Sequence, residues 1–359
     1  MKHSLFILLI AISTMSWGLI DVGSYSLARL FFDQDQQDLP AFTLAFVRFA
    51  LATLVLILLP ILIVTCRNIA TFKSLLIVRR STSIATIDTL LFQQTIYGAI
   101  WGISISFFVM AFQITNSGEF IFILGLCGFT LFHELVKSGG KFNDRLIAII
   151  SFNVFIMAFY LFGVNEPLWL EDQAGNLLFS IGFFIITYHL SFEFKCKVVM
   201  TDDEVLTILP EASHFQIQWF KMLIQFISAT IIALFFLVVW ALDNESIQLQ
   251  QLLVERVNPV NVFDILLVAI YIIVTTVISY FAFNYAVERL NYLSAKDKHI
   301  EDGSKVSASL ASLEPLTACL IAIYSDGGTK WYLLGSIVAF MLYMAYLSKR
   351  NGLGIPVNA

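Results

Sequence analysis

The sequence predicts an all-α polytopic membrane protein in which ten transmembrane helices form two inverted five-helix repeats. Three observations predict this fold: 58% of the 359 residues are hydrophobic, only 13% are charged, and the basic residues gather in alternate loops. A soluble chain of this length needs a polar shell, which so few charged residues cannot supply. A transmembrane helix takes about 20 apolar residues, so the apolar total allows about ten spans with short loops between them.

The apolar runs are about 18 to 26 residues long, which favours helices over the shorter alternating strands of a membrane barrel. In chain order, the predicted spans are 4–27, 41–65, 92–112, 117–135, 146–164, 174–194, 216–241, 263–287, 304–324 and 331–348. No clear small-x-small cleavage site follows the first run, so we interpret it as an uncleaved span and not as a signal peptide.

The basic residues orient these spans. Of the 21 Lys and Arg residues, 16 fall on one side of the predicted membrane, Arg48 and Lys221 lie within spans, and only Arg29, Arg256 and Lys330 lie on the other side. Because short cytoplasmic loops carry an excess of Lys and Arg, we expect both termini in the cytoplasm and the chain in the inner (plasma) membrane. By this topology no cysteine lies in an outer loop, so no disulfide is expected.

The two halves of the chain have matching features. The second span of each half carries a cation near its start, Arg48 in the first half and Lys221 in the second. Each half holds five spans, and because five is odd, the second unit enters the membrane upside down relative to the first. We therefore expect two repeats, at 1–165 and 173–350, with a substrate site near the membrane midplane between them.

Glu314 is the clearest intramembrane charge, about ten residues into the span 304–324. A charged side chain at a helix centre costs at least about 2.5–3.5 kcal/mol, so it persists where it faces a wet path or a partner. Pro315 follows it and frees a backbone carbonyl one turn earlier. A carboxylate beside an irregular backbone favours a solute- or proton-binding site, and the alternative is a structural hydrogen bond to a neighbouring helix.

Thr14, Trp17 and Asp21 share one face of the first span, because helical residues three or four apart lie on the same side. At 1.5 Å per residue, Arg48 on the second span reaches nearly the same depth as Asp21. We expect a partly buried Asp21–Arg48 ion pair that clamps the two helices together. The alternative is that Asp21 contacts the substrate directly.

Polar and aromatic residues also occur at helical spacing on the other spans. His189 and Glu193 lie on one face beside Tyr188, where His189 could relay protons or bind a cationic substrate, unless Glu193 is only an interfacial charge. Glu119 lies near the outer mouth and is expected to attract cations. The other expected cavity residues are aromatic or polar: Tyr97, Trp101, Phe108, Thr276, Tyr280 and Asn284.

Enzyme signatures are incomplete in this sequence. The run from His133-Glu134 to Lys137 lacks the second His of a zinc-protease helix. The run from Gly102 to Ser106 lacks the closing Gly of a serine nucleophile turn. No Gly-rich phosphate loop precedes a Lys-Ser or Lys-Thr pair. We therefore expect no catalytic residue, no metal site, no cofactor and no nucleic-acid partner.

Three stretches resemble EamA-like members of the drug/metabolite transporter superfamily. They are Trp17-Gly18 in the first span, LPAFTLAFVRFALA at 39–52, and VSASLASLEPLTACLIAIY at 306–324, a small-residue helix with a Glu-Pro. The resemblance, which covers roughly residues 5–350, implies two inverted five-helix repeats around a central cavity. It also implies that spans one, three, four, six, eight and nine line the cavity and that the others pack outside.

The sequence departs from the family pattern at Leu126-Cys127, in the hydrophilic run 295–305 and at Asp326-Gly327. The resemblance nonetheless implies a transporter that moves small metabolites, often outward. We expect a secondary transporter that exports a small metabolite, amino acid or drug-like solute by alternating access, with Glu314 binding either a substrate amine or a coupling proton. An uncoupled facilitator or exchanger is the alternative. A membrane-embedded enzyme would need a nucleophile or metal set that the sequence lacks. The expected partners are a small-molecule solute, the lipid bilayer and protons.

Overall fold

The computed structural model is helical throughout the part of the chain that it describes, and no strand occurs there. The described residues are 2–31, 41–66, 84–115, 198–208, 213–243, 262–297 and 302–310, together with short runs between 180 and 195 and between 299 and 321. For these residues the predicted all-α fold is confirmed. The predicted spans 117–135, 146–164 and 331–348 lie outside them.

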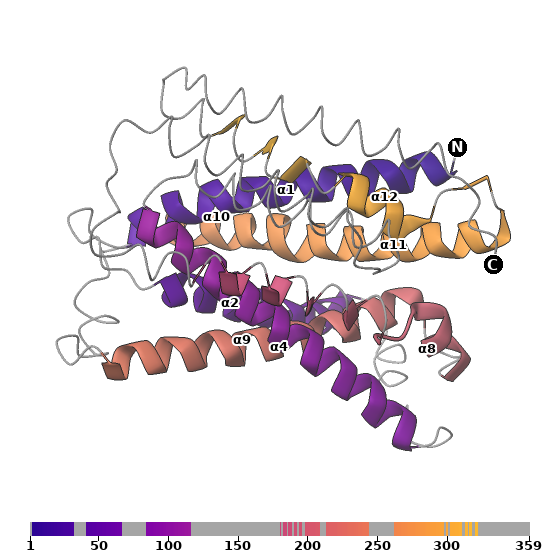
Figure 1. Cartoon of the computed structure of the whole chain (residues 1–359), viewed down its shortest axis with the longest axis horizontal. Helices are drawn as coiled ribbons and strands as arrows, with labels where there is room; N and C mark the ends of the chain where they lie inside the picture. The colour runs from indigo at the N-terminus through magenta and orange to yellow at the C-terminus, as the bar shows by residue number, and fades with distance from the viewer. Residues whose placement is uncertain are drawn as a thin grey trace.

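The helices of the described residues are labelled as in Figure 1. They are α1 (Lys2–Phe31), α2 (Ala41–Cys66), α4 (Ile84–Thr115), α8 (Asp202–Ile208), α9 (His214–Asp243), α10 (Val262–Ile272), the π-helix η2 (Ile273–Ile278), α11 (Ser279–Lys296) and α12 (Gly303–Leu310). The predicted spans 4–27, 41–65 and 216–241 fall within α1, α2 and α9. The span 92–112 lies inside the longer α4, and 263–287 runs through α10, η2 and half of α11.

Two helices begin with reciprocal side-chain caps. Before α8, the Thr201 N–H donates to Glu204 Oε2 at 2.7 Å and the Glu204 N–H donates to Thr201 Oγ1 at 3.3 Å. Before α9, Ser213 and Gln216 repeat this arrangement at 2.8 and 3.3 Å. Such capping boxes satisfy N–H groups that the first helical turn leaves without partners. They fix the first residues of α8 and α9, two helices that follow each other closely in the sequence.

Helices α2 and α9 cross at a pair of threonines. The hydroxyl oxygens of Thr53 and Thr230, which are 177 residues apart in the sequence, lie 3.0 Å from each other in a hydrogen bond. One turn earlier on each helix, the ring centroids of Phe49 and Phe226 lie 6.2 Å apart at a steep angle. Each phenylalanine lies one turn before the threonine of its own helix, so the two contacts belong to one continuous interface between α2 and α9.

The two helices run in opposite directions. Near the start of α9, Trp219 donates its indole N–H to the carbonyl oxygen of Leu56, in the second half of α2, at 2.9 Å. Going forward along α2 therefore means going backward along α9. The match between Arg48 and Lys221 in the two predicted repeats stays a prediction.

Two glycines let α4 approach α9 closely. A Cβ atom on Gly98 would lie 2.6 Å from the Cα atom of Gln225, and one on Gly102 would lie 2.8 Å from the Cα atom of Ala229. These distances are far shorter than an ordinary contact between carbon atoms. The glycines are therefore required for the observed spacing of the two helices. Figure 1 shows α2, α4 and α9 crossing one another.

Helix α1 lies along α11 and also contacts α12 (Figure 1). The buried apolar residues that join these helices are Ile10, Ala286, Leu290 and Val306. At the start of α12, Gly303 lies so close to the carbonyl oxygen of Val287 that a Cβ atom there would clash with it. This second group of helices faces the group formed by α2, α4 and α9.

Among the described residues, two helical stretches are long and apolar enough to cross a membrane, His214–Val239 and Ala269–Lys296. Their surfaces carry large apolar side chains, such as Ile231 at 60% exposure and Ile278 at 54%. Polar side chains such as Gln225 are buried in the interior. An apolar surface over a partly polar interior is compatible with a helical membrane protein, since soluble proteins place most polar side chains outside.

Replacing Gly98 by Ala should lower the free energy of unfolding by about 1–3 kcal/mol, because the backbone of α9 must move to admit the new methyl group. Denaturant unfolding of the purified protein in detergent measures this change. The matched control is Gly182→Ala, where a Cβ atom would meet no described atom within 4 Å. A Gly98→Ala protein as stable as the Gly182→Ala protein would contradict the close approach of α4 to α9.

Candidate functional site

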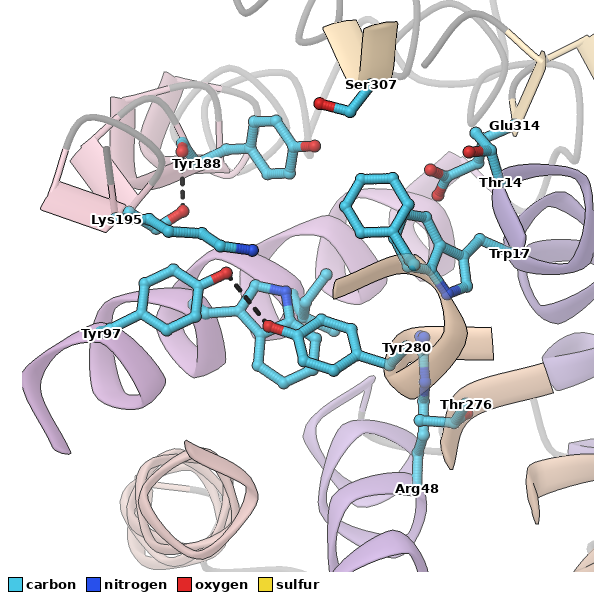
Figure 2. Close-up of a pocket in the computed structure, with 14 residues that line it drawn as sticks. Thr14, Trp17, Arg48, Tyr97, Tyr188, Lys195, Thr276, Tyr280, Ser307 and Glu314 are labelled. Carbon is cyan, nitrogen blue, oxygen red and sulfur yellow. Dashed lines mark hydrogen bonds between the residues drawn. The ribbon is translucent and has the colours of Figure 1, made fainter. Parts of the chain in front are cut away.

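A cavity of about 110 Å³ lies among α1, α2, α4, η2, α11, the helical residues 180–195 and the segment from α12 to 314 (Figure 2). Nine of the residues singled out in the sequence line it: Thr14, Trp17, Arg48, Tyr97, Trp101, Tyr188, Thr276, Tyr280 and Glu314. They come from both halves of the chain. Side chains that share a face on separate predicted helices therefore converge on one place in the fold.

Aromatic rings form one wall of this cavity. The rings of Trp101 and Tyr280 stack at 5.2 Å with an angle of 26° between their planes. Trp101 also meets the ring of Phe226 edge-on at 5.2 Å, and Trp17 lies 4.7 Å from Phe283. These ring contacts join α1, α4, α9 and α11, so the wall is held by packing from four helices.

A chain of hydrogen bonds runs behind the rings. The Tyr280 hydroxyl donates to Gln225 Oε1 at 3.1 Å, so it accepts from the Tyr97 hydroxyl, which lies 3.1 Å away (Figure 2). Gln225 Nε2 donates in turn to Gln94 Oε1 at 2.5 Å. All four side chains are buried. Sequence reasoning missed Gln94 and Gln225, because amides on two separate helices give no sign of meeting.

Lys195 reaches into the cavity from the segment 180–195. Its Nζ donates to Asn284 Oδ1 at 2.6 Å and lies 5.7, 6.0 and 5.9 Å from the ring centroids of Tyr97, Tyr280 and Phe283. From the sequence, Lys195 was counted among the cytoplasmic loop residues, as expected for a long cation at the end of a span. The structure instead turns its ammonium group inward.

A helical spacing could have revealed Lys195. Tyr188, Ser191 and Lys195 fall at i, i+3 and i+7, which places them on one helix face, and all three line the cavity. The same spacing identified Thr14 and Trp17 on the first span. The position of Lys195 beyond the apolar run concealed this pattern.

Arg48 and Glu314 also line the cavity. The resemblance implied that the second span packs outside the cavity, so the position of Arg48 corrects that expectation. In Figure 2, Glu314 points into the cavity from the side opposite Lys195, and Arg48 enters beside Thr276. The cavity therefore has two cations and one carboxylate among its described residues.

The π-helix η2 brings a polar group to the cavity. Thr276 lies in η2, lines the cavity and is only 2% exposed. Its hydroxyl has no hydrogen-bond partner among the described residues. Single turns of π-helix occur frequently at functional sites, because the extra residue reorients nearby side chains. A hydroxyl in this position is available to a solute.

Several predicted site residues lie outside the described part of the structure. They are Glu119, His189, Pro315 and the side chain of Asp21. The Asp21–Arg48 ion pair therefore stays a prediction. Asn284 is described and is buried next to the cavity, where it accepts the hydrogen bond from Lys195. Phe108 is not among the lining residues and packs against Phe184 at 5.0 Å.

A second buried polar cluster surrounds Asp202 at the start of α8. Lys221 Nζ lies 2.7 Å from Asp202 Oδ1, and Gln218 Nε2 donates to Asp202 Oδ2 at 2.7 Å. The side chains of Asp202 and Lys221 are 2% and 6% exposed. Lys221 thus ties α9 to α8 and does not reach the cavity, unlike Arg48.

Comparison with known proteins adds no further identification: no family model, curated protein or solved structure matches the chain. Within the described residues, no three His, Cys, Asp or Glu side chains come together as metal ligands would. The described cavity offers charged groups, hydroxyl groups and aromatic faces to a bound molecule.

Replacing Lys221 by Met should lower the free energy of unfolding by about 3–5 kcal/mol, because it leaves the Asp202 carboxylate buried without its cation. Thermal unfolding in detergent measures the loss. Replacing both residues, as Asp202→Leu with Lys221→Met, should restore much of it, since the buried carboxylate of Asp202 is then removed together with its cation. The control is Lys305→Met on the exposed face of α12. Equal melting temperatures for Lys221→Met and Lys305→Met would rule out a stabilising ion pair.

Proposed function

We propose that the protein is a secondary transporter of small solutes in the inner (plasma) membrane, built from two inverted five-helix repeats and working by alternating access. One observation carries the proposal: Arg48, Lys195 and Glu314 converge on a single cavity in a chain that is only 13% charged. Charged side chains within membrane spans are costly, and they mark solute and ion paths when they face one cavity.

The crossing of α2 and α9 supports the inverted repeat. The second spans of the two proposed repeats contact each other through Thr53 with Thr230 and Phe49 with Phe226, and these two helices run in opposite directions. A two-fold axis lying in the membrane plane would relate the helices in this way. Such an axis would pass close to the threonine pair, beside the cavity, where a transporter of this architecture binds its solute.

Trp17 and Phe283, which both line the cavity, form a contact that could break when one repeat moves away from the other. Trp17 belongs to the first repeat and Phe283 to the second, and they contact each other through rings alone. Contacts of this kind can separate without leaving a buried polar group unsatisfied. Behind them, Gln94 of the first repeat is hydrogen-bonded to Gln225 of the second, which also binds Tyr280, so this layer would be the place about which the repeats move.

Glu314 has two candidate roles at this site. It would bind either an ammonium group of the solute or a coupling proton, which gives proton-coupled transport in the second case. The uncoupled facilitator remains the competing function. The resemblance in the sequence implies outward transport, and small metabolites, amino acids and drug-like solutes are the candidate cargo.

Transport can be tested with the purified protein in liposomes loaded with a defined mixture of small acids, amines, amino acids and sugars. Mass spectrometry should show that a subset of the solutes leaves these liposomes faster than it leaves liposomes without protein. Ser307→Leu should reduce this efflux several-fold, because Ser307 lines the cavity and is 3% exposed. Ser309→Leu on the exposed face of the same helix is the matched control. Identical efflux with and without protein would refute transport.

The role of Glu314 can be tested by its replacement with Gln. If Glu314 carries the coupling proton, the wild-type rate should depend on pH between about 5 and 8, whereas Glu314→Gln should transport slowly and without that dependence. Melting temperatures of the two proteins control for misfolding. If the Glu314→Gln protein retains the wild-type rate and pH profile, this carboxylate binds neither the coupling proton nor the solute.

A further inference from the structure

The ammonium group of Lys195 occupies an aromatic box. Tyr97 from α4 and Tyr280 and Phe283 from α11 place their ring centroids 5.7–6.0 Å from Nζ. Proteins use such boxes of rings to bind the ammonium group of a ligand, because the face of each ring attracts a cation. Here the cation in the box belongs to the chain itself.

The box is preformed by contacts that do not involve Lys195. The hydroxyl of Tyr280 is held between Tyr97 and Gln225, and its ring is stacked on Trp101 at 5.2 Å. Asn284, one turn after Tyr280 on α11, supplies the hydrogen-bond acceptor for Nζ at 2.6 Å. The rings would therefore keep their positions if the ammonium group were removed.

The charges along the cavity favour an anion. Lys195 and Arg48 both line it, and Glu314 is the one carboxylate among the described lining residues; Glu288, which interacts electrostatically with Lys195, does not line it. Two cations raise the local potential, so an anionic solute is attracted and a cationic one is repelled. A guanidinium can also bind a carboxylate through two parallel hydrogen bonds. The hydroxyl of Thr276 beside Arg48 is a further donor (Figure 2).

We propose that Lys195 sets the charge selectivity of this cavity: the site binds small organic anions with a carboxylate or similar head, and it refuses cations because the chain's own ammonium group fills the aromatic box. The transport of such anions rests on the function proposed above, whereas their binding does not. With an anionic solute, the role left to Glu314 is that of the coupling proton.

The size of the cavity limits the solute. At about 110 Å³ it is smaller than a cavity of about 150 Å³ that holds benzene. Suitable probes therefore have about six non-hydrogen atoms. Lactate, 2-aminopropan-1-ol and propane-1,2-diol share a three-carbon skeleton and are an anion, a cation and a neutral molecule at pH 7. They differ mainly in charge, so they isolate the property under test.

Binding is measured as the rise in melting temperature of the purified full chain in detergent as each probe is added, since a solute that binds the folded state stabilises it. The wild-type protein should be stabilised by lactate and not by the other two probes. In Lys195→Met, the affinity for lactate should fall by about tenfold or more, and 2-aminopropan-1-ol should now stabilise the protein. Lys195→Arg should keep the preference for lactate.

Lys296→Met is the matched control, because Lys296 also lies over a tyrosine ring, at 4.0 Å from the centroid of Tyr292, but is exposed on α11. It should bind the probes as the wild type does. If Lys195→Met melts early without any probe, Lys195→Gln provides the same loss of charge and keeps a donor for Asn284. A wild-type protein that binds the amine, or binds none of the probes, would overturn the proposal, as would a neutral variant that keeps the preference for lactate.

Flux of the same probes through liposomes separates this proposal from the proposed function. Lactate binding without lactate flux would support the anion site and contradict the transport function. Flux of 2-aminopropan-1-ol in preference to lactate would support the transport function and contradict the anion site.

Discussion

The close packing of α4 against α9 is the contact on which the cavity depends. Because Gly98 and Gly102 have no side chains, the backbone of α9 comes near enough for Gln225 to reach Gln94 and Tyr280. Those hydrogen bonds hold Tyr280, whose ring carries one wall of the cavity. Any residue larger than glycine at position 98 would push α9 away and loosen the wall.

The polar groups of this protein are buried in a particular order. Nearest α9, the side chains of Tyr97, Tyr280, Gln225 and Gln94 form a chain of hydrogen bonds, which lowers the cost of burying them. Next come the aromatic rings, and the charged groups of Arg48, Lys195 and Glu314 lie at the cavity surface. A buried cation needs compensation, and the groups around Lys195 include one amide oxygen, three ring faces and the Glu288 carboxyl group. The cavity thus combines a rigid wall with charges that a solute can reach.

Helical spacing predicted part of the candidate site well. Thr14 and Trp17 were identified because their spacing places them on one face, and this spacing depends only on the local helix. Tyr280 and Trp101 were found in the same way. The positions of Arg48 and Lys195 were misjudged, because one lies on a helix that the family resemblance places outside and the other lies beyond an apolar run. The direction in which a long cation turns depends on what surrounds it, which no local pattern records.

The amino-acid sequence alone determined that this chain is helical and apolar and which faces of its helices carry polar groups, since composition and a period of 3.6 residues are local properties. Only the tertiary structure decided which of those faces meet. The register of α2 on α9 is set by side chains 177 residues apart, and the aromatic box around Lys195 needs rings from two helices. Contacts between residues so distant in the chain depend on how the helices pack, and packing is settled by the shapes of all the neighbours together.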